Sequence, residues 1–294
     1  MKWEAWISAT RPKTLVASFL PVMVGASLAF SVQEEINLYL LVLCFGFSLL
    51  VQIGTNLSND YFDFIRGTDR NRLNAPTRAV ASGLLKPNHV RSAAYLFMGF
   101  SFAVGIAIYK ISEGPNLLIL IGIASVMCGI LYTGGPYPLA YNGLGDFFVI
   151  LFYGFIAVEA THFVLLAEQK AEYSPDLIAA LSMGCMTNIL LVANNYRDYK
   201  EDKKNKKNTL IVIFGRKFGF FLFIACYLIS LVICPILEPR LSLLYICLPL
   251  SVLGALKIRK AKTKKEFDQL LSFCAISLVC SGLLTTTAIL LYYN

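Results

Sequence analysis

Two polar segments of this 294-residue chain combine asparagine with aspartate at helical spacing. The first reads NLSNDYFDFIRGTD over residues 56–69, and the second reads NNYRDYKEDKKNKKNTL over residues 194–210. Side chains three, four or seven positions apart lie on one face of a helix. The side chains predicted to share a face are Asn56, Asn59 or Asp60, and Asp63 in the first cluster, and Asp198 with Asp202 in the second. Gly67 is predicted to end the first helix before Asp69.

The chemistry of these side chains indicates a divalent cation. Carboxylates at positions i and i+4 of a helix repel each other by roughly 0.2–0.5 kcal/mol in water, and a bound cation removes that repulsion. Carboxylate and carboxamide oxygens suit Mg²⁺, which commonly binds phosphate oxygens as well, and Mn²⁺ is a possible substitute. No His or Cys accompanies either cluster, so zinc, copper and iron are poorly supported. The candidate metal ligands are Asn59, Asp60, Asp63, Asp69, Asp198 and Asp202.

A single cluster of this kind would be equally well explained as a helix end with ion pairs at a membrane interface. Two clusters, both led by asparagine and both followed by basic residues, favour a functional site. The interleaved bases are candidate phosphate ligands, although each taken singly is more typical of a topology anchor. They are Arg66, Arg72, Arg78, Arg197 and Lys207. Arg78 is a better candidate than the average of these, because Ser82 and Gly83 follow it on a segment without other charges.

The rest of the chain is apolar, with 57% hydrophobic residues, 15% charged residues and a mean hydropathy of +0.64. Soluble domains are usually about a quarter charged. Apolar stretches long enough to cross a bilayer, about 20 residues each, recur along the whole length. They predict an all-α membrane bundle of nine spans, forming one polytopic domain over residues 1–294. The expected spans are 14–33, 37–57, 92–109, 115–133, 143–166, 174–194, 217–237, 241–256 and 270–292.

The positions of the basic residues predict the orientation of this bundle. With nine spans and a cytoplasmic N-terminus, all 26 Lys and Arg residues except Lys110, Lys170 and Arg240 fall in cytoplasmic segments or at their borders. This is the positive-inside rule, so the net charge of +8 indicates contact with a lipid bilayer and needs no nucleic acid. The polar segments 58–91, 132–146 and 195–216 would then converge on the cytoplasmic face.

A metal, a phosphate ester and a deep apolar bundle together indicate a substrate that is anionic at one end and hydrophobic along its length. A prenyl diphosphate has this character. Ionising its allylic C–O bond requires that the leaving diphosphate be neutralised by a cation and bases. The allyl cation must then be kept from water, which a cavity inside the membrane can do.

Four segments carry a resemblance to a known family: RPKTL (11–15), NDYFDFIRGTD (59–69), YTGGPYPLAYNGLGD (132–146) and NNYRDYKEDKKNKKNTL (194–210). Over about residues 8–215 the chain resembles the UbiA superfamily of intramembrane aromatic prenyltransferases, which carry two Asp-rich motifs on cytoplasmic loops of a nine-helix bundle. Within it the chain is most similar to the branch that prenylates 1,4-dihydroxy-2-naphthoate in menaquinone synthesis. The reaction implied is Mg²⁺-dependent polyprenyl transfer with loss of CO₂ and diphosphate, giving demethylmenaquinol, at the cytoplasmic face of the plasma membrane.

The resemblance also implies roles for individual residues. Metal-bound diphosphate would lie between the first cluster (Asn59, Asp60, Asp63 and Asp69) and the second (Asp198 and Asp202), with Arg78 and Lys207 on the diphosphate. Tyr132, Tyr137 and Asp146 would lie near the reacting centre, and Arg11 and Lys13 would bind the carboxylate of the aromatic acid. Asn56, Arg66, Arg72 and Arg197 complete the candidate substrate-binding residues.

Other interpretations stay open at this point. The acceptor could instead be 4-hydroxybenzoate, homogentisate, a chlorin or haem. A transporter of anionic or divalent-cation substrates would place its polar site near the bilayer midplane, often within inverted repeats, whereas these acids lie at helix ends on one face. Glu159 and His162 lie inside the fifth expected span and could form a proton relay or a structural ion pair. Because they lie near the outer end of that span, the structural ion pair is the favoured interpretation.

Overall fold

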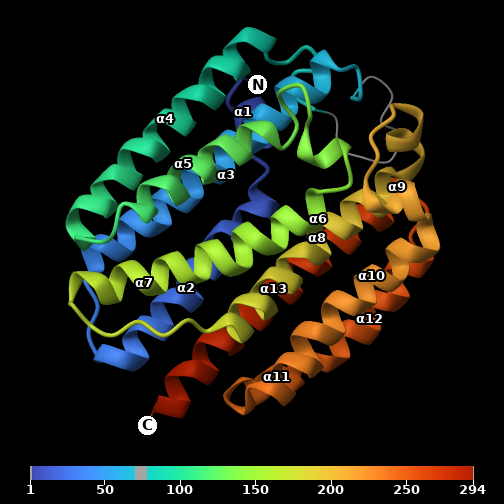
Figure 1. Ribbon diagram of the computed structural model, residues 1–294. Coiled ribbons are helices and arrows are strands. Elements are labelled where there is room, and N and C mark those ends of the chain that lie inside the picture. Colours follow the sequence, from blue (N-terminus) through green and yellow to red (C-terminus); the bar gives the residue numbers. More distant parts are fainter. Residues whose placement is uncertain (1, 70–77, 294) are drawn as a thin grey trace.

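The computed structural model describes residues 2–69 and 78–293, and within these ranges the chain is helical with no strand (Figure 1). The first half contains α1 (Lys2–Thr10), α2 (Pro12–Gln33), α3 (Leu38–Ile65), α4 (Pro87–Ser112), α5 (Leu117–Leu131), η1 (Leu139–Tyr141), α6 (Gly145–Val149), η2 (Ile150–Ile156) and α7 (Ala157–Glu168). The second half contains α8 (Leu177–Lys204), α9 (Leu210–Phe214), α10 (Arg216–Leu228), η3 (Ile229–Ile233), α11 (Cys234–Leu237), η4 (Pro239–Cys247), α12 (Leu248–Lys260) and α13 (Lys264–Tyr293).

Eight helices in the described residues are long and apolar enough to cross a membrane, several of them formed by consecutive short elements such as α6, η2 and α7. The all-α, multi-pass membrane architecture predicted from sequence is therefore confirmed. The expected count of nine is not confirmed, because the fourth expected span corresponds to α5. That helix has 15 residues, which at 1.5 Å per residue gives about 22 Å, short of the roughly 30 Å hydrocarbon core.

The connections between helices gather at two opposite ends of the bundle (Figure 1). The links 34–37, 113–116 and 169–176 lie at one end, and the segments 132–144 and 205–209 lie at the other. The second end also holds the turn that follows α3. This arrangement matches the expectation that the polar segments share a face, while the assignment of that face to the cytoplasm stays a prediction.

Helices α3 and α8 deliver the two acid clusters to this end. Each begins at a capping side chain, since Asn37 accepts a hydrogen bond from the Leu40 N–H (3.1 Å) and Asp176 accepts one from the Ala179 N–H (3.0 Å). Such caps satisfy amide groups that the first turn leaves unpaired. Each helix runs 28 residues, about 42 Å, which exceeds the apolar core of a bilayer. Their last turns, which carry the acids, therefore extend beyond the apolar core toward the membrane surface.

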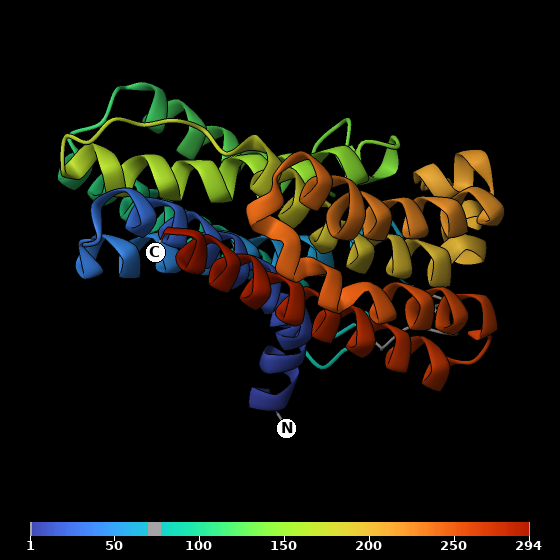
Figure 2. The same cartoon turned by 90° about the horizontal axis from the view of Figure 1, so that it is seen from below.

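Helix α1 projects from the bundle near the same end (Figure 2). Its Ala5 and Ala9 are buried against Leu57 of α3 and against Ala79 and Val80 of the loop before α4. This contact fixes the start of α2, where the N-terminal segment enters the site described below.

The main apolar core surrounds α8, which packs against η2, α10 and α13. At the η2 contact the two backbones touch, because a Cβ at Gly154 would lie 2.5 Å from the Ala180 carbonyl oxygen and 2.9 Å from the Cα of Gly184. Close approach at small residues is the usual packing of membrane helices. Each of the eight cysteines is a free thiol, six of them buried, as expected for packing residues.

The Gly154→Ala variant should be destabilised by about 1–3 kcal/mol, since a methyl group there must push apart two helices whose backbones cannot yield locally. Thermal unfolding of the detergent-solubilised protein measures this. Gly46→Ala is the matched control, because a Cβ at that helical glycine meets nothing within 4 Å. Equal melting temperatures for the two variants would contradict the tight contact.

Glu159 and His162 lie at the opposite end of the bundle from the acid clusters. The Glu159 carboxylate accepts hydrogen bonds from the Tyr173 hydroxyl (2.8 Å) and the Asp176 amide (3.1 Å), and its Oε2 lies 3.5 Å from Nδ1 of His162. These contacts hold the 169–176 link against α7. They favour the structural interpretation of this pair over a proton relay.

Candidate active site

Two adjoining cavities meet near the acid clusters: a polar one lies at that end of the bundle, and an apolar one extends from there toward the opposite end, as far as Cys44, Tyr109 and Leu118. One has a volume of about 270 Å³ and is mainly apolar, and the other has about 360 Å³ and is lined by charged side chains. Arg11, Asn59 and Tyr132 line both cavities, so these residues mark the boundary between them. Together the cavities suit a ligand with an anionic head and an apolar tail.

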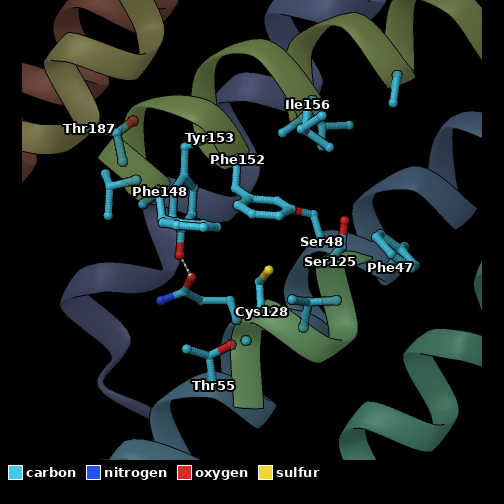
Figure 3. Close-up of a pocket in the computed structure, with 18 of the residues that line it drawn as sticks. Phe47, Ser48, Thr55, Ser125, Cys128, Phe148, Phe152, Tyr153, Ile156 and Thr187 are labelled. Atoms are coloured by element: carbon cyan, nitrogen blue, oxygen red, sulfur yellow. Dashed lines mark hydrogen bonds between the residues drawn. The ribbon is translucent and has the colours of Figure 1, made fainter. Parts of the chain in front are cut away.

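Aromatic side chains from α6 and η2 form one wall of the apolar cavity (Figure 3). Phe148, Phe152 and Tyr153 point into it, with Cys128 of α5 facing them. The Tyr153 hydroxyl donates a hydrogen bond to the Gln52 side chain of α3. Segment η2 is a π-helix, a form often found at functional sites.

The first acid cluster occupies the last turns of α3, which ends at Ile65 as expected, and Gly67 then reverses the chain at φ 75°. Asp63 is 2% exposed, and both of its oxygens are engaged. Its Oδ1 accepts a hydrogen bond from the Tyr141 hydroxyl (2.7 Å), and its Oδ2 lies 3.3 Å from Nη2 of Arg78. Arg78 also approaches Asp69, with its Nε 3.6 Å from Oδ1.

Asp60 has a different environment. It is 1% exposed, and neither carboxylate oxygen has a hydrogen-bond partner within the described part of the chain. The Arg11 guanidinium and the backbone amides of Ala79 and Val80 are near enough to stabilise a charge there. Burying a carboxylate without hydrogen bonds costs free energy unless a cation compensates its charge. Asp60 is therefore a strong candidate to bind a further cation.

The second acid cluster lies on α8. Asp198 lines the polar cavity, and Arg197 donates to both of its oxygens, from Nε at 2.7 Å and from Nη2 at 2.9 Å. Asp202, one turn further, is 4% exposed. Asp69 and Asp202 are both buried, but neither is among the described residues that line the two cavities. The structure thus brings Asp60, Asp63 and Asp198 to the polar cavity, while Asp69 and Asp202 are buried outside its lining.

Segment 132–146 closes the site between the two clusters. Tyr132 and Asp146 line the polar cavity, and Asn188 of α8 donates a hydrogen bond to Oδ1 of Asp146 (3.1 Å). Burial, aided by the charge of Asp146, raises the pKa of the Tyr132 hydroxyl. Burial and the neighbouring Asp63 raise the pKa of the Tyr141 hydroxyl in the same way.

Tyr137 corrects one expectation from the sequence. Its side chain is 62% exposed, and it is not among the described residues that line either cavity. The tyrosine of this segment that reaches the first acid cluster is Tyr141. Pro138 lies between them and precedes the short helix η1, whose turn buries Tyr141 and leaves Tyr137 outside.

The basic candidates divide into three groups. Arg11, Lys13, Arg78, Arg197 and Lys207 line the polar cavity. Arg66 is exposed and instead donates hydrogen bonds to the backbone carbonyls of Thr133 and Gly135, so it braces the loop. Arg72 lies outside the described residues.

Asn56 and Asn59 connect the first cluster to its neighbours. The Asn56 amide donates to the Thr10 carbonyl (2.9 Å) and so holds the junction of α1 and α2. Asn59 Oδ1 accepts a hydrogen bond from the Thr133 hydroxyl (2.7 Å), which ties α3 to the segment after α5. Both asparagines also line a cavity.

Comparison with known proteins agrees with this geometry. The model of the UbiA prenyltransferase family matches residues 18–289. The chain belongs to this family. It is therefore a membrane-embedded prenyltransferase.

Two bacterial relatives of this UbiA family member are described as 1,4-dihydroxy-2-naphthoate octaprenyltransferase. The one from Bacillus subtilis is 32% identical over 83% of this chain and 78% of its own length. The one from Escherichia coli is 32% identical over 72% of this chain and 69% of its own length. In Gallus gallus, UbiA prenyltransferase domain-containing protein 1 is 28% identical over 92% of this chain and 79% of its own length.

Solved structures share the fold. A UbiA homologue from Archaeoglobus fulgidus bound to GPP and Mg²⁺ superposes with a TM-score of 0.61 at 16% identity, over 96% of this chain and 99% of that one. Digeranylgeranylglyceryl phosphate synthase superposes with a TM-score of 0.57 at 20% identity, over 98% and 99% of the two chains.

The residues of this UbiA protein fit a hard divalent cation. The donors that face the polar cavity are carboxylate and carboxamide oxygens, and Asp60 offers two buried oxygens without hydrogen bonds. The described side chains do not form a ready-made group of three or more acids, histidines or cysteines around one point. This agrees with a site that the protein completes only in part, since Mg²⁺ usually takes one or two carboxylates together with substrate phosphates and water.

Several residues of the site were not found from the sequence. Three of them hydrogen-bond directly to candidate site residues: Thr133 to Asn59, Tyr141 to Asp63 and Asn188 to Asp146. The other two act one step further away, since Thr68 bonds to Tyr141 and Asn205 bonds to the Thr68 carbonyl. The position of Tyr141 inside a segment dense in Gly, Pro and Tyr was the one available signal. Nothing in the spacing distinguished it from Tyr137.

Proposed function

We propose that this prenyltransferase transfers a polyprenyl group from polyprenyl diphosphate to 1,4-dihydroxy-2-naphthoate, with loss of diphosphate and CO₂, to give demethylmenaquinol. One observation carries the proposal: two acid clusters more than a hundred residues apart flank a polar cavity that continues into an apolar one. The relatives described as 1,4-dihydroxy-2-naphthoate octaprenyltransferase support this acceptor.

The diphosphate would occupy the polar cavity. Asp60 and Asp63 on α3 and Asp198 on α8 would hold Mg²⁺, with Asn59 as a further oxygen ligand and Asp69 and Asp202 supporting from behind. When bound, the metal supplies charge stabilisation to the departing diphosphate. Arg78 and Lys207, which line the same cavity, add positive charge from the protein. The homologue with bound GPP and Mg²⁺ supports Mg²⁺ and a prenyl diphosphate as the ligands of this fold.

The apolar cavity would hold the prenyl chain, with the allylic carbon near Tyr132 at the boundary. When the bond between this allylic carbon (C1) and the diphosphate oxygen breaks, its electron pair leaves with the diphosphate. The aromatic wall of Phe148, Phe152 and Tyr153 excludes water while the ring carbon of the acceptor attacks C1.

The acceptor would enter the polar cavity with its carboxylate toward Arg11 and Lys13. Attack by the carbon that bears the carboxylate releases a hydroxyl proton, for which Asp146 is the proposed acceptor. Loss of CO₂ leaves its bonding pair in the ring, and the proton returns to restore the naphthoquinol. The reaction therefore balances without an oxidant or a net proton.

The acceptor assignment is tested with purified protein in detergent, labelled prenyl diphosphate and a panel of aromatic acceptors, with and without Mg²⁺. The expected product is a prenylated naphthoquinol, with one CO₂ released per turnover and no turnover in chelator. Prenylated 4-hydroxybenzoate with its carboxylate intact, and no reaction with the naphthoate, would assign the protein to another acceptor.

The orientation of the site is tested by accessibility labelling in cells. Cysteines introduced as Arg70→Cys and Lys206→Cys should react only from the cytoplasmic side of the plasma membrane, and Glu113→Cys only from the other side. Reaction of the first two from opposite sides would rule out a site built from both clusters.

A further inference from the structure

Tyr141 contacts both acid-bearing segments of the candidate active site. It ends the short helix η1 and is 9% exposed. The Tyr141 hydroxyl donates a hydrogen bond to Oδ1 of Asp63 (2.7 Å). The Thr68 hydroxyl lies 2.7 Å from the Tyr141 hydroxyl oxygen. Because the single phenolic hydrogen is used on Asp63, Thr68 must be the donor to Tyr141. The phenol is thus held between two residues of the first acid segment.

The ring and backbone of Tyr141 reach two further groups. The Arg66 guanidinium lies 5.3 Å and the Lys207 ammonium 5.2 Å from the ring centroid, within the range of cation–π attraction. The Tyr141 carbonyl accepts a hydrogen bond from the Asn208 amide (3.0 Å). One residue therefore touches α3, the turn after it, and the segment that follows α8.

A direct link between the two acid-bearing segments runs beside this residue. Asn205, which follows α8, donates to the Thr68 carbonyl (3.2 Å), and Asn142 pairs with Asn208 in a parallel bridge. The relative position of the two segments is therefore set by contacts that centre on Tyr141 and its two neighbours in space, Thr68 and Asn208.

We propose that Tyr141 is the positioning residue of the diphosphate site, acting on both of its halves. Its hydroxyl fixes the rotamer of Asp63, so that one carboxylate oxygen is held by the phenol and the other faces the cavity side where Arg78 lies. Its ring and carbonyl fix Lys207 and Asn208 on the opposite half. This inference rests on the proposed function, since it assigns a metal-diphosphate complex to the polar cavity.

The expected effect follows from how outer residues orient metal ligands. Removing a hydrogen bond to a ligand commonly costs 10–100-fold in metal affinity or activity. The Tyr141→Phe variant keeps the ring and the backbone contact and loses only the bond to Asp63. This variant should raise the Mg²⁺ concentration that supports half-maximal binding of geranyl diphosphate by about 10-fold. At saturating Mg²⁺, its affinity for geranyl diphosphate should stay within about 3-fold of the parent's.

The experiment measures equilibrium binding of labelled geranyl diphosphate to the detergent-purified full chain, without acceptor, as Mg²⁺ is varied. Tyr137→Phe is the matched control, because that tyrosine lies in the same segment and is exposed. It should bind as the parent does. In an Asp63→Asn background, Tyr141→Phe should cause no further loss, because the two residues act through one interaction.

Each outcome decides the matter. If Tyr141→Phe melts at a lower temperature but binds with the parent's Mg²⁺ dependence, Tyr141 is structural only and the inference is wrong. An additive loss in the Asp63→Asn background would also overturn it. If the parent itself binds geranyl diphosphate without Mg²⁺ dependence, the proposed metal-diphosphate function fails first, and the two failures are distinguishable.

Discussion

The Asp60→Asn variant is expected to lose prenyl transfer by about 100-fold or more, the scale at which removal of one charge-stabilising group affects turnover. Asp60 is buried, faces the polar cavity and has no hydrogen-bond partner for either oxygen among the described residues. An amide there cannot offer the same charge to Mg²⁺. Asp198→Asn on the opposite wall is expected to behave alike, because both halves are needed to hold one metal-diphosphate complex.

Steady-state turnover with labelled prenyl diphosphate, over a range of Mg²⁺ concentrations, measures this loss. Asp268→Asn provides the matched control, since Asp268 lines the same cavity from α13 but belongs to neither acid cluster. That control should keep activity within a few-fold of the parent. Near-normal turnover in a folded Asp60→Asn protein would overturn the metal assignment, and full activity in chelator would do so independently.

The Asp146→Asn variant is expected to lower turnover by roughly 10²–10⁴-fold, the usual contribution of a positioned acid or base, with a much smaller effect on prenyl diphosphate binding. Asp146 is 4% exposed, lines the polar cavity beside Tyr132, and is oriented by Asn188. An asparagine has nearly the same shape but cannot accept the hydroxyl proton of the acceptor.

The comparison that checks this is turnover against equilibrium binding of geranyl diphosphate, both at saturating Mg²⁺. Parallel losses in the two measurements would place Asp146 on the diphosphate rather than on the acceptor. The Asn188→Leu variant adds a graded case, because it keeps the carboxylate and removes its hydrogen-bond donor. Its turnover should fall between those of the parent and Asp146→Asn.

Patterns within single segments explain why the sequence alone predicts the acid clusters, the turn at Gly67 and the apolar spans. The spacing of Asn56, Asp60 and Asp63, and of Asp198 and Asp202, follows from the helical repeat, because a continuous helix places such residues on one face. The turn at Gly67 follows from the conformational freedom of glycine. The apolar spans follow from length and hydropathy, since a bilayer leaves the backbone few alternatives to a helix.

Some helix boundaries could not be derived in the same way. Helix α5 is at least as apolar as its neighbours, yet it ends at Leu131, because the chain turns directly after it and Gly135, at φ 73°, leads toward η1. Hydropathy measures composition and not where packing stops a helix. The fourth span expected from hydropathy, 115–133, is therefore longer than the helix that forms.

The amino-acid sequence alone determined the all-α membrane architecture, the two acid clusters and the end of the bundle where they meet, because these depend on patterns within single segments. Only the tertiary structure decided that Tyr141 rather than Tyr137 contacts Asp63, that Arg78 joins Asp63 to Asp69, and that Asp69 and Asp202 do not line the polar cavity. Those contacts join irregular loops to helices far away in the chain. Irregular segments have no repeat from which a side chain's direction can be inferred, so their partners are set by packing across the whole bundle.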